Sequence, residues 1–166
     1  MIKQDFAKQN TMDWLLESND IGVRHLALRD LAQANPKELA TAKKQAHTKG
    51  PIANVLAKMK KEGYWRKPGA GYSPKYKGSI WSIILLAQLG ASIDMDKRIE
   101  LACSYLLDHS LTQAGQFTVH GTASATIDCL QGNLCAPFAL AFQINLPVLL
   151  AGTSYKEPIE YHGRPS

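Results

Sequence analysis

Residues 63–65 (Gly-Tyr-Trp) and 78–90 (GSIWSIILLAQLG) form a pattern that returns at residues 115–117 (Gly-Gln-Phe) and 132–140 (GNLCAPFAL). In each copy a helical segment precedes a glycine–aromatic turn, and an apolar helical segment follows it. The offset is 52 residues at the turn and 54 residues at the start of the second helix. A spacing of this size indicates stacked supersecondary units, each of which buries an apolar face against its neighbour.

Capping residues predict where the helices begin and end. Asp20 and Asn35 occupy N-cap positions, and Pro36 follows at the first helical position. Gly63 and Gly90 stand where helices end. The expected helices cover residues 12–17 capped by Thr11, residues 20–31, residues 35–47, residues 52–62, residues 79–89 capped by Ser79, residues 94–107 capped by Asp94 or Asp96, and residues 134–142 capped by Asn133.

Helical spacing also predicts which side chains are buried. The helix that begins at Asp20 is expected to bury Val23, Ala27 and Leu31, and the later amphipathic helix to bury Ile99, Ala102, Cys103 and Leu106. Residues 80–89 are apolar almost all round, so this helix should be buried on more than one side.

No segment has a convincing strand pattern, so we expect an all-α fold with buried inner helices and amphipathic outer helices. The 166 residues suit a single helical-repeat domain. Its predicted parts are entry helices at 1–50, two hairpin repeats at 51–143 and an irregular tail at 144–166.

Composition limits the cellular setting. No run reaches the ~20 apolar residues of a membrane span, and the N-terminus lacks the apolar stretch of a signal peptide. The default expectation is therefore a cytoplasmic protein without a membrane span. Three cysteines do not suggest a disulfide framework, and we expect Cys103, Cys129 and Cys135 to be free, small buried residues.

The repeated segments, together with residues 129–134 (CLQGNL), resemble the prenyltransferase/squalene-oxidase repeat over about residues 50–143. That repeat builds the α/α toroid of terpenoid cyclases and of protein prenyltransferase β-subunits. The resemblance implies an incomplete toroid of stacked antiparallel hairpins. Nearer the N-terminus, Asp20, Val23, Arg24, Ala27 and Leu31 resemble a HEAT-type helical repeat, which would form an entry unit for the toroid.

Departures from the family pattern argue against its catalysis. The proton-donating cyclases use an Asp-x-Asp-Asp motif, but residues 94–97 read Asp-Met-Asp-Lys and are better explained by helix capping. The prenyltransferases hold zinc with an Asp and a Cys two positions apart, whereas Asp128 and Cys129 are adjacent. His120, Asp128, Cys129 and Cys135 form a chemically conceivable zinc set without paired spacing. We expect no catalytic residue, metal or cofactor.

The resulting hypothesis is a non-catalytic or incomplete cyclase-like module that binds a ligand or another chain. The ligand would be a small apolar molecule, and an exposed apolar edge would favour self-association or membership of a longer repeat protein. The candidate binding residues are Trp65, Tyr72, Tyr76, Ser79, Trp81, Ser82, Gln88 and Asn133.

Two alternatives stay open. The first is a cyclase- or prenyltransferase-like enzyme that acts on an isoprenoid-like substrate between the inner helices. The second is nucleic-acid binding through residues 58–77, where aromatic and basic residues are interleaved. Residues 37–77 carry eleven lysines or arginines against two glutamates, while the rest of the chain has a net negative charge. A solvated face of amphipathic helices is the simpler explanation of that charge.

Overall fold

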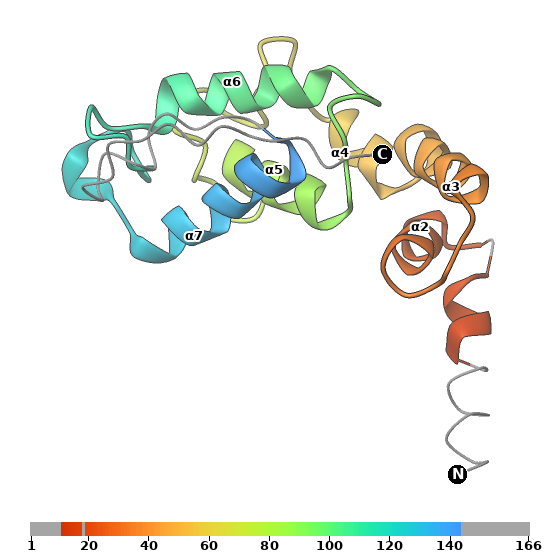
Figure 1. The fold of residues 1–166 in the computed structure, drawn as a ribbon. Coiled ribbons are helices and arrows are strands. Elements are labelled where there is room, and N and C mark those ends of the chain that lie inside the picture. Colours follow the sequence, from red (N-terminus) through yellow and green to blue (C-terminus); the bar gives the residue numbers. More distant parts are fainter. Residues whose placement is uncertain (1–10, 18, 144–166) are drawn as a thin grey trace.

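The computed structural model describes residues 11–17 and 19–143, which form helices joined by turns and loops (Figure 1). Within these ranges β pairing is limited to two isolated bridges, Leu111 with Phe117 and Thr118 with Thr126. The all-α class is therefore confirmed. The predicted tail at 144–166 lies outside the described residues, and the division of the chain into entry helices and two hairpin repeats stays a prediction.

Helices α2 (Ile21–Asp30) and α3 (Pro36–Lys49) pack as a pair at one end of the molecule (Figure 1). Both predicted caps are confirmed, because the Asp20 and Asn35 side chains accept hydrogen bonds from backbone N–H groups three residues on. Arg24 joins the two helices through a 2.7 Å ion pair with Glu38.

The predicted inward face of α2 is wrong in part, since Ala27 is buried but Val23 and Leu31 are exposed. The buried face of α2 instead includes Gly22, which packs closely against Pro51. A Cβ added to Gly22 would lie 2.7 Å from Pro51 Cγ, so this face of the helix turns toward the chain that leaves α3. The buried residues of α2 are Gly22, His25, Ala27 and Leu28. The first expected helix also differs, because residues 11–15 are helical and Thr11 lies inside the helix.

Helix α5 (Ser79–Gln88) is central to the rest of the fold. It packs against α4 (Pro51–Leu56), α6 (Arg98–Ser110), α7 (Asp128–Ala136) and the π-helical segment η2 (Pro137–Ala141) (Figure 1). Burial on more than one side is thus confirmed. The predicted inward face of α6 is also confirmed. The fully buried apolar side chains on these two helices are Ile80, Ile83, Leu86, Ile99, Ala102, Cys103 and Leu106.

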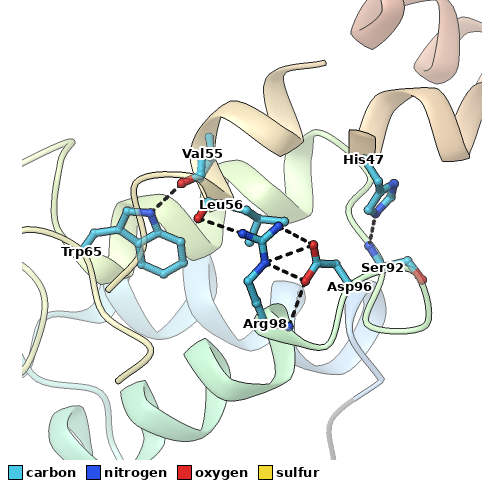
Figure 2. Close-up of polar contacts among 7 residues, drawn as sticks. All are labelled: His47, Val55, Leu56, Trp65, Ser92, Asp96 and Arg98. Carbon is cyan, nitrogen blue, oxygen red and sulfur yellow. Dashed lines mark hydrogen bonds and ion pairs between the residues drawn. The ribbon is translucent and has the colours of Figure 1, made fainter. Parts of the chain in front are cut away.

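Helix α4 ends at Leu56, six residues before the predicted end. Two side chains donate hydrogen bonds to the carbonyl groups at its C-terminus (Figure 2). The Trp65 indole N–H donates to the Val55 carbonyl at 2.8 Å, and Arg98 Nη1 donates to the Leu56 carbonyl at 3.4 Å. The same carbonyls also accept from the backbone N–H groups of Lys58 and Met59, at 3.2 and 3.1 Å. The helix thus tightens into turns after Leu56, and the two side chains hold this end in place.

Three further predictions about helix starts are wrong. Ser79 is the first residue of α5 and Gly78 is its cap. Lys97 precedes α6, although Asp96 does accept a hydrogen bond from the Arg98 N–H. Asn133 is an exposed residue inside α7. The chain remains helical through Gly132 and Asn133 because Leu130, Leu134 and Phe138 are buried at helical spacing and outweigh the weak local propensity.

The two glycine–aromatic turns, which lie 52 residues apart, have matching hydrogen bonds. In the first turn the Lys60 N–H donates to the Tyr64 carbonyl at 2.8 Å, and in the second the Thr112 N–H donates to the Gln116 carbonyl at 2.9 Å. Gly63 and Gly115 donate back to residues 60 and 112, at 3.0 and 2.9 Å. Their φ angles are +98° and +81°, which favours glycine at both positions.

Each turn is joined to the following helix in the same way. The Trp65 N–H donates to Ser79 Oγ at 3.0 Å, and the Phe117 N–H donates to Gln131 Oε1 at 2.8 Å. Both aromatic side chains are buried, with 3% and 1% of their surface exposed. Ser79 and Gln131 are 52 residues apart, as the two turns are, although the helices that carry them begin 49 residues apart, at Ser79 and Asp128.

We predict that Ser79→Ala and Gln131→Ala each lower the free energy of unfolding by about 1–3 kcal/mol, because each leaves a backbone N–H of the turn without its acceptor. Urea unfolding followed by circular dichroism measures this. Gln88→Ala, at an exposed position of α5, is the control and should change stability by less than about 0.5 kcal/mol. Equal stability of all three variants would contradict a structural role for these bonds.

Candidate functional site

The predicted ligand-binding residues fall into three structural groups. Trp65, Ser79 and Ser82 are buried and take part in hydrogen bonds inside the fold. Gln88 and Asn133 are exposed on α5 and α7. Tyr72, Tyr76 and Trp81 form an aromatic cluster where the long loop meets α5. Ligand binding by these eight residues stays a prediction.

The aromatic cluster is centred on Trp81. Its ring centroid lies 5.2 Å from that of Tyr72 and 5.0 Å from that of Tyr76, and its indole N–H donates to the Tyr72 carbonyl at 2.8 Å. Tyr76 is 72% exposed although its φ angle of +62° is strained for a bulky residue. The Lys75 ammonium lies 5.1 Å from the Tyr76 ring centroid. The loop thus presents an aromatic surface with a cation beside it.

A cavity of about 730 Å³ lies where α2 and α3 meet the end of α5, the segment after it and η2. We call it the His25 pocket. The sequence prediction of ligand-binding residues missed it completely. The pocket is lined by His25, Arg29, Leu39, Lys43, Ala87, Gly90, Ala91, Ser92, Ile93, Asp94, Glu100, Leu140, Ala141, Phe142 and Gln143.

His25 is the distinctive group in this pocket. Only 2% of its surface is exposed, and its Nδ1 atom has no hydrogen-bond partner among the described residues. Burial lowers the pKa of His25, and the nearby Arg29, His47 and Lys43 lower it further. A buried polar atom without a partner is unusual and costly. The Nδ1 atom is itself buried, so a ligand in the pocket reaches it only when the ring or a neighbouring side chain shifts.

Gly90 allows α2 to approach the end of α5. Its φ angle of +74° ends the helix as predicted. A Cβ at this position would lie 2.5 Å from Arg29 Nη1 and 3.1 Å from His25 Cε1. Because Gly90 has no side chain, the Arg29 guanidinium and the His25 ring can pack directly against the end of α5.

His47 connects α3 to the segment that lines the pocket, as Figure 2 shows. Its Nε2 atom accepts a hydrogen bond from the Ser92 N–H at 3.0 Å. Nδ1 lies 2.8 Å from the Lys43 carbonyl, and because a carbonyl only accepts, Nδ1 carries the proton. Both nitrogens are therefore satisfied in the neutral ring. Burial lowers the pKa of His47, which favours that neutral form.

Asp96 lies in the segment that was compared with the cyclase acid motif. It forms a 2.7 Å ion pair with Arg98, which lowers its pKa (Figure 2). A carboxylate held in its charged form is the opposite of a shielded proton donor. Burial raises the pKa of the Cys103 thiol to about 12, so this cysteine is a poor nucleophile.

The remaining sequence candidates do not converge on a metal site. Among residues 11–17 and 19–143 there is no group of three or more His, Cys, Asp or Glu side chains that could hold a metal ion. Cys103 is buried as predicted, but Cys129 is exposed and Cys135 is half-buried. The buried prediction fails at Cys129 because this residue lies away from the α7 face that carries Leu130 and Leu134.

No protein-family model, curated protein or solved structure matches the chain. The resemblance to the prenyltransferase/squalene-oxidase repeat therefore continues to depend on the residues quoted for it. In the part of the chain that the structure describes, the helices are too short or too polar to cross a bilayer.

The two buried histidines predict a loss of stability in mild acid. Since the folded-state pKa of each lies below the ordinary value of 6.5, the unfolded chain binds more protons as the pH falls. Their contribution is present above pH 6.5 and is lost as the pH falls toward the folded-state pKa values. The free energy of unfolding should therefore decrease between pH 7 and pH 5.

This pH dependence should be weaker in His25→Gln and His47→Gln than in the parent protein. Urea unfolding at half-unit pH intervals measures the slope. His120→Gln is the matched control, because His120 is exposed and is not among the residues that line the pocket. If both variants retained the full slope of the parent protein, the dependence would come from other groups.

Proposed function

We propose that this protein is a non-catalytic helical-repeat module, related to an incomplete cyclase-type toroid, that binds a small molecule in the His25 pocket. The observation that carries this proposal is the unpartnered Nδ1 atom of a buried histidine beside a cavity of about 730 Å³. A cavity of this size is typical of small-ligand sites.

The position of the pocket also supports binding. It lies between the α2–α3 pair on one side and α5, α6 and η2 on the other. Ligand sites are common where two packed units meet. Its lining combines apolar side chains with about as many polar or charged ones. Part of the wall belongs to η2, and π-helical segments are frequent at functional sites.

An enzyme that acts on an isoprenoid-like substrate is the less favoured alternative. Asp96 is held in its ionised form and Cys103 is a poor nucleophile, so neither supplies the acid or nucleophile that such a reaction needs. Binding of a partner chain, including a second copy of this one, also remains a proposal. Three large apolar side chains are exposed on these elements: Leu85 on α5, Leu101 on α6 and Leu140 on η2.

We predict that small molecules from a fragment library bind in the His25 pocket and perturb the amide NMR signals of residues 90–94. Ala87→Phe should abolish these shifts, because Ala87 lines the pocket and an added ring would occupy it. Ala136→Phe, at an exposed α7 position outside the pocket, should leave them unchanged. A library without hits near residues 90–94, or hits that survive Ala87→Phe, would count against the proposal.

A specific observation favours nucleic-acid binding as a second candidate. Tyr76 is highly exposed and strained, and it lies in the basic segment 58–77 beside Trp81 and Lys75. Aromatic rings next to cations can stack on unpaired bases while the cations contact phosphates. The aromatic cluster would then act as the stacking surface.

This second candidate predicts a gel mobility shift with single-stranded oligonucleotides at low salt, weakened as salt rises. Combined replacement of Lys67, Lys75 and Lys77 by Gln should abolish the shift. Combined replacement of Lys37, Lys44 and Lys49, exposed on α3, removes the same charge and should leave most of the binding. Equal loss in both triple variants would indicate only a general charge effect, and the absence of any shift would exclude this candidate.

A further inference from the structure

The charged side chains around the His25 pocket are separated by sign. Arg29 and Lys43 belong to the wall formed by α2 and α3, whereas Asp94 and Glu100 belong to the wall formed by the segment after α5 and by α6. Asp94 and Glu100 are exposed, and Glu100 lies 3.4 Å from Lys97 in an ion pair. The pocket therefore has a basic side and an acidic rim.

The positive charges of the basic side influence the His25 ring. Besides burial, the positive charges of Arg29 and Lys43 lower the pKa of His25. The carboxylate of Asp30 on α2 has the opposite effect and raises the pKa of His25. Asp94 and Glu100 of the rim are not among the groups that shift the pKa of His25. An anion near this ring would consequently meet a favourable potential.

Hydrogen-bonding capacity is left over on the basic side. Asp30 binds Arg29 through Nε at 2.6 Å and Nη2 at 2.7 Å. Within the described residues, Arg29 Nη1 and the Lys43 ammonium have no hydrogen-bond or ion-pair partner, and His25 Nδ1 has none either. The two cationic groups of this wall can donate to an oxygen anion directly, and the buried His25 Nδ1 atom can join them after a small shift of its ring.

Much of the remaining lining is apolar. Leu39 of α3 and Ile93 after α5 contribute aliphatic surface, and Leu140 and Phe142 contribute more from the η2 end. Leu140 is 75% exposed, which is high for a leucine beside a cavity. An apolar group of a ligand in this part of the pocket would cover surface that is now in contact with water.

We infer that the His25 pocket binds a small amphipathic acid: a single carboxylate or phosphate head beside His25, Arg29 and Lys43, with an apolar tail along Leu39, Ile93, Leu140 and Phe142. This inference rests on the proposed function, because it names the ligand class of the same pocket. The head carries one anionic group, since a second one at the far end would meet the acidic rim of Asp94 and Glu100.

Three eight-carbon probes test this inference on the full chain. Octanoate has the head and tail, octanamide has the same shape without the charge, and octanedioate adds a second carboxylate. In NMR titrations at pH 7, octanoate should bind saturably, with shifts at His25 and at residues 90–94. Both other probes should bind about tenfold more weakly, because a charge-assisted hydrogen bond is lost or the rim repels the second anion.

Two matched lysine variants locate the head group. Lys43→Met removes a charge that lines the pocket and should weaken octanoate binding about tenfold while leaving octanamide unaffected. Lys44→Met removes the neighbouring exposed charge on α3 and should change neither affinity. Both substitutions are at positions outside the buried core, and thermal unfolding of each variant verifies that it folds.

The outcomes separate the two proposals. Equal affinity for octanoate and octanamide, with no effect of Lys43→Met, would overturn the anionic head while the pocket remained a ligand site. Failure of octanoate to bind would also overturn it, and fragment hits that Ala87→Phe removes would then show that the pocket accepts another class. Only the absence of such hits would overturn the proposed function itself.

Discussion

A turn that donates its backbone N–H to a side chain on the next helix is the interaction on which the fold depends. It occurs twice, from Trp65 to Ser79 and from Phe117 to Gln131. In each case the bond lets a large aromatic side chain enter the core without leaving its own N–H unpaired. The start of α5 and the first part of α7 are thereby fixed against the loops that precede them.

The α2–α3 pair is attached to the rest of the fold by a few specific contacts as well as by apolar packing. Gly22 packs closely on Pro51, and the His47 ring receives the Ser92 N–H. Gly90 admits Arg29 and His25 against the end of α5. Ala46 of α3 also belongs to the main hydrophobic core, and Ile21 of α2 packs against that core. The two parts therefore share apolar contacts as well, and the His25 pocket lies at their junction.

The sequence was sufficient for features that depend on local chemistry. The caps at Asp20 and Asn35, the helix end at Gly90 and the buried face of α6 follow from short-range spacing, and each is confirmed. Features set by tertiary contacts were missed. The early end of α4 depends on Trp65 and Arg98, which are distant in sequence, and the helical state of Asn133 depends on burial of its neighbours.

The candidate site was missed for the same reason. Its lining residues come from five separate segments, and no motif connects them. His25 is one position in a helix whose predicted inward face was a different one, so the sequence offered no reason to place its ring in a cavity. Gly90 was recognised as the end of a helix, but its close approach to Arg29 requires knowledge of how α2 packs.

The two buried histidines show how the same pKa direction can have different functional meanings. Burial lowers the pKa of both rings. In His47 each nitrogen has a partner, so the neutral ring is already satisfied and its contribution is to hold α3 against residue 92. In His25 the Nδ1 atom has no partner among the described residues, and the desolvation cost is not repaid within the fold. A ligand that supplies an acceptor, or a charge that favours the protonated ring, recovers part of that cost on binding. This difference in hydrogen bonding, more than the cavity volume, makes His25 the group to which a ligand is expected to bind.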